Sequence, residues 1–127
     1  MDKKIVITAA IIACLAVVFG AFGAHALKEL INQEALATFE VGVRYQMYHA
    51  LALLFIGLST AIPTKTKKHV TFCFVFGVFL FSGSIYLLSL KEIMPFAVSK
   101  IAFLTPIGGL FFIVGWILLV LRVWKLK

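Results

Sequence analysis

Four long runs of apolar residues, separated by short polar stretches, dominate the pattern of this chain. They cover about residues 5–24, 41–62, 70–90 and 101–123. Each run is close to the length of about 20 residues that a helix needs to cross the hydrocarbon core of a bilayer. None alternates apolar and polar residues as the strands of a membrane barrel do. The pattern predicts an all-α membrane protein whose four transmembrane helices form a single domain over residues 1–127.

The composition indicates that lipid, rather than water, is the main solvent of these runs. Hydrophobic residues make up 63% of the 127 residues and charged residues 13%, whereas soluble domains average about 45–50% and about 25%. A domain of this size has too little interior to bury that excess. We therefore expect a multi-pass protein of the cell membrane, that is, of an inner or plasma membrane.

The first run also has features of a secretory signal peptide. Lys3 and Lys4 precede it, and Ala24-His25-Ala26 has the form of a cleavage site. The run is nevertheless long enough to span the bilayer. We therefore expect it to remain in place as the first transmembrane helix.

The basic residues predict an orientation, because short cytoplasmic loops carry an excess of Lys and Arg. One side of the predicted bundle has eight: Lys3, Lys4, Lys65, Lys67, Lys68, Arg122, Lys125 and Lys127. The other side has three: Lys28, Lys91 and Lys100. Arg44 is not counted, because it begins the second helix. The prediction is that both termini are cytoplasmic (N-in, C-in). The formal charge of +7 then anchors the protein at anionic lipid headgroups and does not indicate nucleic-acid binding.

Small and aromatic residues suggest how the helices pack. The first run has a stripe of small residues at helical spacing: Ala9, Ala13, Ala16, Gly20 and Gly23. Such stripes let helix backbones approach closely in membranes, and we expect this one to face the third helix. The third run is rich in phenylalanine, and we expect its rings, Phe74 among them, to face lipid in part. Residues 27–39, where apolar and polar positions alternate at helical spacing, predict a short amphipathic helix on the outer surface.

Polar residues inside the bilayer are expensive, so their positions are informative. On the predicted topology they gather in the outer half, on all four helices. We predict that eight of them line a polar pocket that opens outward and binds a ligand: His25, Glu40, Arg44, Tyr45, His49, Ser84, Tyr86 and Thr105. Arg44 suits a phosphate or carboxylate there, and His49 titrates near neutral pH.

Structural explanations of the same residues stay open. Glu40 and Arg44 lie four positions apart and can form an interfacial ion pair, and Tyr45 and Tyr48 fit an aromatic belt. His49 lies about two turns inside its helix, where an interhelical hydrogen bond is an alternative to a proton or metal site. If the last helix begins near residue 104, Pro106 falls in its first turn, where its missing N–H is harmless; an earlier start predicts a kink.

Metal and redox chemistry find little support. The cysteines, Cys14 and Cys73, both lie in apolar runs, and the chain has no CxxC pair or Cys/His cluster. No metal site or cofactor is predicted. A catalytic arrangement of nucleophile, base and orienting group is not recognisable either, which favours a protein that is not an enzyme.

Several motifs together resemble a known family. They are Gly20-Ala21-Phe22-Gly23-Ala24-His25, Tyr45-Gln46-Met47-Tyr48-His49, Phe81-Ser82-Gly83-Ser84-Ile85-Tyr86, Thr105-Pro106-Ile107-Gly108-Gly109 and Gly115-Trp116. In this order they resemble the transmembrane protein 256-like family, also called domain of unknown function 423. The resemblance implies a four-helix bacterial inner-membrane protein and no particular activity.

Three functions are compatible with these observations. The first is a module that binds or transports a lipid, small amphiphile or ion through the outer pocket. The second is a structural or accessory membrane subunit, alone, as a homo-oligomer or with a protein partner, whose polar residues join its helices. The third is an intramembrane enzyme that uses His25 or His49 as a base.

Overall fold

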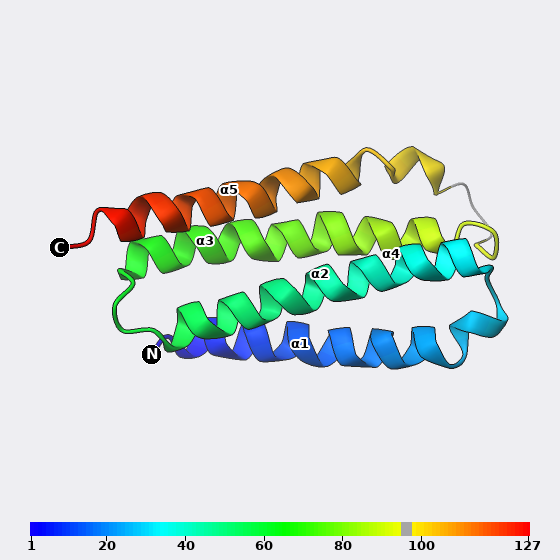
Figure 1. Ribbon diagram of the computed structural model, residues 1–127, viewed down its shortest axis with the longest axis horizontal. Helices are drawn as coiled ribbons and strands as arrows, with labels where there is room; N and C mark the ends of the chain where they lie inside the picture. The colour runs from blue at the N-terminus through cyan, green and yellow to red at the C-terminus, as the bar shows by residue number, and fades with distance from the viewer. Residues whose placement is uncertain (95–97) are drawn as a thin grey trace.

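The computed structural model describes residues 1–94 and 98–127, and every regular element in these ranges is helical. Four long helical spans run alongside one another (Figure 1). They comprise Lys3–Glu29, Gln33–Leu58, Thr64–Ser89 and Ser99–Trp124, and each is long and apolar enough to cross a membrane. This confirms the prediction of an all-α protein, and its four long apolar helices are consistent with four membrane spans.

Some of the spans contain more than one helical element. The long helices are α1 (Lys3–Ala24), α2 (Gln33–Leu58), α3 (Thr64–Gly77) and α5 (Leu104–Trp124). The third span continues from α3 through a π-helical turn, η2 (Val78–Ser82), into α4 (Gly83–Ser89). Two 3₁₀ turns, η1 (Leu27–Glu29) and η3 (Ser99–Ile101), precede α2 and α5. Because α5 begins at Leu104, Pro106 falls in its first turn. This is the first of the two predicted alternatives, in which the proline causes no kink.

The predicted amphipathic helix over residues 27–39 is wrong. A 3₁₀ turn of three residues takes part of this stretch, and its Leu27 is fully buried rather than laid on a surface. The remainder belongs to α2, which begins eight residues before the predicted position 41. The physical reason is the cap: the side chain of Asn32 accepts the backbone N–H of Ala35 at 2.8 Å, which satisfies a free donor of the first turn.

The two middle spans form the centre of the bundle. α1 packs along α2, α2 packs along η2 and α4, and α3 packs along α5. Figure 1 accordingly shows α1 and α5 at the two edges, with α2 and the third span between them. Over an apolar stretch of 18 residues in each span, the share of buried residues is 39% in the two middle spans and 17% in the two edge spans. Both termini lie at one end of the bundle (Figure 1), together with the α2–α3 connection. We call this the basic end, and the other the opposite end.

The small-residue stripe of α1 faces α2, so the prediction that it faces the third helix is wrong. Ala9 and Ala16 are each 1% exposed. A Cβ atom added at Gly23 would lie 3.2 Å from the ring of Phe39 on α2. The short connection of residues 25–32 makes α1 and α2 antiparallel neighbours, and the stripe lets them approach closely.

Aromatic rings and glycines interlock between α3 and α5. The ring of Phe112 fills the space beside Gly77, and the ring of Phe74 fills the space beside Gly115, where an added Cβ would lie 2.5 Å away. Phe74 is fully buried, so the expectation that it faces lipid is wrong, whereas Phe79 on the same span is 73% exposed. When a helix has apolar residues on all its sides, its sequence does not show which side packs against other helices and which side faces lipid.

Candidate functional site

His49 lies at the centre of the polar residues inside the bundle and is 4% exposed. Trp116 donates its indole N–H to Nε2 of His49 at 3.1 Å. Because indole can only donate, Nε2 must accept, and the ring proton lies on Nδ1. Nδ1 then donates to the carbonyl of Tyr45 at 2.8 Å. The ring also stacks on Phe112, with centroids 3.6 Å apart. Both nitrogens and one face of the imidazole are therefore occupied by protein.

Gln46 joins three helical spans through its amide group. Its Nε2 donates to the backbone carbonyl of Ile12 on α1 at 2.9 Å. Its Oε1 accepts the hydroxyl of Tyr86 on α4 at 2.6 Å. Gln46 is 3% exposed, so both bonds are shielded from water and lipid alike.

Serine hydroxyls make two further interhelical links near the polar centre. Ser82, at the end of the π-helical turn, donates to the carbonyl of Gly42 on α2 at 2.7 Å. The hydroxyls of Ser84 and Thr105 lie 2.6 Å apart and join α4 to α5. π-Helical turns are frequent at functional sites, but the polar group at this one is used to hold a neighbouring helix.

The structure does not gather the eight predicted pocket residues into one group. Ser84 contacts Thr105, Tyr86 contacts Gln46, and the ring of Tyr45 packs near that of His49. The other three, His25 at the end of α1 and Glu40 and Arg44 on α2, are exposed, as is Tyr45 at 39%. Whether any of the eight residues binds a ligand stays a prediction.

Gln46, Ser82 and Trp116 take part in these contacts and were not among the predicted residues. One sequence signal was present. Gly42, Gln46, His49 and Leu53 recur at spacings of four, three and four, which places them on one helix face, and all four are buried. A glutamine at such a position, inside an apolar run, indicates an interhelical hydrogen bond.

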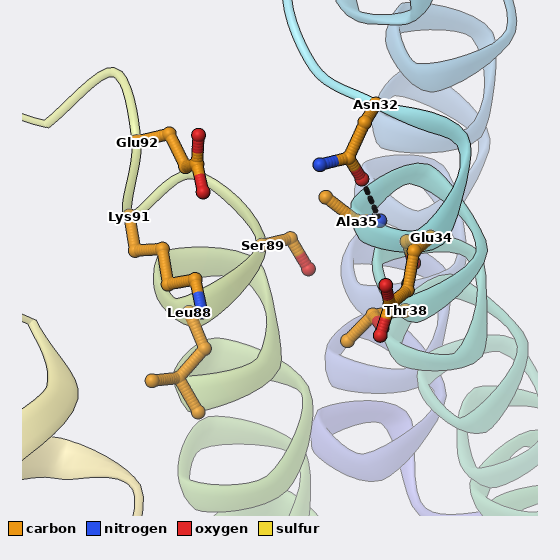
Figure 2. A pocket seen from close by; sticks show the side chains of 8 residues that line it. All are labelled: Asn32, Glu34, Ala35, Thr38, Leu88, Ser89, Lys91 and Glu92. Atoms are coloured by element: carbon orange, nitrogen blue, oxygen red, sulfur yellow. Dashed lines mark hydrogen bonds between the residues drawn. The ribbon is translucent and has the colours of Figure 1, made fainter.

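A separate cleft of about 360 Å³ lies at the opposite end of the bundle, between the start of α2 and the end of α4. Figure 2 shows Asn32 and Ser89 on its two walls. None of the eight predicted residues lines it. The lining consists of Asn32, Glu34, Ala35, Thr38, Leu88, Ser89, Lys91 and Glu92. Within residues 1–94 and 98–127, no group of three or more His, Cys, Asp or Glu side chains is arranged to hold a metal ion.

Four apolar spans with an interior of paired polar groups define a small multi-pass membrane protein. The family described as Protein of unknown function (DUF423) matches residues 19–109. The chain belongs to this family, as the sequence motifs indicated.

Curated relatives extend the similarity over nearly the whole chain. A UPF0382 membrane protein of Staphylococcus saprophyticus is 40% identical over 124 residues, which cover 98% of this chain and 99% of the relative. A UPF0382 membrane protein of Haemophilus influenzae is 35% identical over 127 residues, which cover 100% of this chain and 98% of the relative. A UPF0382 membrane protein of Bacillus subtilis is 40% identical over an alignment that covers 97% of this chain and 98% of the relative. These bacterial relatives confirm the membrane location. No solved structure matches the chain.

Proposed function

We propose that this protein is a structural or accessory membrane module whose central polar residues hold its helices together. The observation that carries the proposal is the pairing of those residues with one another. Gln46 holds α1 and α4, His49 holds α5 through Trp116, and Ser82 holds α2. In lipid, where apolar contacts give no preference for one neighbour, such bonds select which helices associate.

A binding or transport function has narrower support. Of the eight residues that were predicted to form its pocket, five contact other helices, and four are exposed, because Tyr45 does both. The observation in its favour is the cleft of about 360 Å³ at the opposite end, whose size suits a small amphiphile or headgroup. Its lining includes the carboxylates of Glu34 and Glu92 and the ammonium group of Lys91, so a ligand there could both donate and accept hydrogen bonds.

A double-mutant cycle tests the structural role of Gln46. We expect Gln46→Leu and Tyr86→Phe each to lower the free energy of unfolding in SDS titrations of detergent-solubilised protein. The coupling energy between them should be about 0.6–1.7 kcal/mol, between the average and the maximum measured for hydrogen bonds between membrane helices. Tyr48→Phe is the matched control, since that tyrosine is 54% exposed; it should leave unfolding unchanged.

The same variants separate the two functions. Zero coupling, with an unchanged unfolding curve, would contradict the structural role. If Tyr86→Phe also removed a molecule that co-purifies with the wild-type protein, the polar centre would be a binding site instead.

We further propose that the basic end faces the cytoplasm, because eight Lys and Arg residues lie there. In a variant with Cys14 and Cys73 replaced by alanine, cysteines introduced at Lys65 and Lys91 report the orientation. A membrane-impermeant maleimide added to intact cells should label the Lys91→Cys protein and not the Lys65→Cys protein. Labelling of the Lys65 site alone would invert the proposed orientation, and labelling of both would contradict the four-span arrangement.

A further inference from the structure

The net charge of the chain is concentrated at the basic end. Eight of the 12 Lys and Arg residues lie there. Of the five acidic residues in the chain, only Asp2 lies at this end. The opposite half of the bundle has four basic and four acidic residues. The whole formal charge of +7 therefore lies at one end, and a partner of that end should be anionic.

Lysines from two helices border a depression of about 600 Å³ at this end. They are Lys3, Lys4, Lys67 and Lys68. Lys67 is 6% exposed, and its ammonium group donates to the carbonyl of Ser59. Asp2 caps α1, because its carboxylate accepts the backbone N–H groups of Lys4 and Ile5 at 3.1 and 3.3 Å. The single carboxylate is thus used by the helix, and the exposed lysines remain available to an anion.

An apolar groove of about 400 Å³ adjoins this depression and runs between the start of α1 and residues 68–76 of α3. Its apolar lining is Ile5, Phe72, Val75 and Phe76. Asp2, Lys4 and Lys68 line both cavities, so the groove has a basic mouth. Thr71 also lines it, and in the part of the chain that the structure describes, its hydroxyl oxygen is the one buried side-chain N or O atom without a hydrogen-bond partner.

We propose that this groove binds an anionic phospholipid. The phosphate lies between Lys4 and Lys68 at the mouth, and one acyl chain follows the groove between α1 and α3. Basic pockets between transmembrane helices are suited to anionic headgroups, and the stems of lysines can lie along apolar surface while their ammonium groups reach the phosphate. The site is remote from the polar centre and does not depend on the structural role proposed for it.

Native mass spectrometry of the full chain in a neutral detergent tests the site. The probes are phosphatidylglycerol, phosphatidylcholine with the same acyl chains, and inorganic phosphate. We expect phosphatidylglycerol to bind at least about tenfold more tightly than phosphatidylcholine, from the attraction between lysines and an anionic headgroup. Inorganic phosphate should not compete at the same concentration, because it lacks the acyl chain. Equal affinity for the two lipids, or competition by inorganic phosphate, would overturn the proposal.

Two variants of equal charge locate the site. Lys4→Gln combined with Lys68→Gln should weaken phosphatidylglycerol binding about thirtyfold, since two basic contacts to the headgroup are lost. Lys125→Gln combined with Lys127→Gln removes the same charge from the same end, outside both cavities, and should change binding less than about twofold. If both pairs weaken binding equally, the lipid responds to diffuse charge and the groove is not its site.

A third variant tests the groove without changing charge. Thr8 also lines the groove, and Thr8→Phe places a ring where the acyl chain is proposed to lie. We expect this variant to lose phosphatidylglycerol binding while its SDS unfolding curve stays like that of the wild type. Unchanged lipid binding in a folded Thr8→Phe protein would show that the acyl chain lies elsewhere.

Discussion

Replacing Gly108 with alanine is expected to destabilise the bundle strongly in detergent. The added Cβ would lie 2.8 Å from the carbonyl carbon of Leu80 and from the Cα of Phe81. These are backbone atoms of the π-helical turn, so no side-chain rotation relieves the clash. Ser82, in the same turn, is bonded to α2, which opposes a shift of the turn as a whole. We expect a loss of about 3 kcal/mol in the free energy of unfolding, the upper range for overpacking.

The neighbouring glycine provides the control for this prediction. A Cβ at Gly109 would come no closer than 3.8 Å, to a side-chain atom of Phe81, which is an ordinary contact. Gly109→Ala should therefore unfold like the wild-type protein, or slightly later, because alanine favours a helix more than glycine does. SDS titration and thermal unfolding of the two variants give the comparison. Equal stability of the two would mean that α5 does not approach the third span at Gly108.

The number and nature of the helices follow directly from the sequence, because a bilayer imposes both. Backbone groups in hydrocarbon must be paired within a helix or a closed barrel, and four apolar runs of spanning length leave little choice. The ends of the helices are less determined. α2 begins at Gln33 because Asn32 caps it and the helix extends beyond its apolar run, a local effect that hydropathy does not register.

The neighbours of each helix were harder to predict. A stripe of small residues shows that some backbone comes close, but lipid tails are as apolar as the competing helices, so the stripe does not identify its partner. The stripe of α1 thus faces α2 and not the third span. For the same reason the sequence did not distinguish Phe74, which is buried, from Phe79, which is exposed.

The eight polar residues were predicted to converge on one pocket, whereas the structure distributes them over separate interhelical contacts and exposed positions. The sequence shows how far along its span each residue lies, and on this basis Tyr86 and His49 were predicted to lie within the membrane-spanning part of the bundle. It does not give the rotation of one helix relative to the next. The amide of Gln46 bonds to Ile12 on α1 and to Tyr86 on α4. Arg44, two residues earlier on the same helix, lies on the exposed face.

Truncation of His49 should have the second large effect, and it tests whether the polar centre is a packed structure. His49→Ala removes a ring that stacks on Phe112 at 3.6 Å, meets Phe74 edge to face at 4.9 Å, and accepts the indole proton of Trp116. We expect a loss of about 2–5 kcal/mol, as for other large-to-small changes in packed interiors.

Two further substitutions divide this effect into its parts. Trp116→Phe removes the indole donor and keeps an aromatic ring at the position, so it should lose only about 1–2 kcal/mol, mainly the interhelical hydrogen bond. Tyr48→Ala changes the adjacent residue, which is 54% exposed, and should lose less than about 0.5 kcal/mol. The measurement is again SDS unfolding. If His49→Ala were no more harmful than Tyr48→Ala, the imidazole would contribute little to the packing of α2 on α5. That result would contradict the proposal that the central polar residues of this protein hold its helices together.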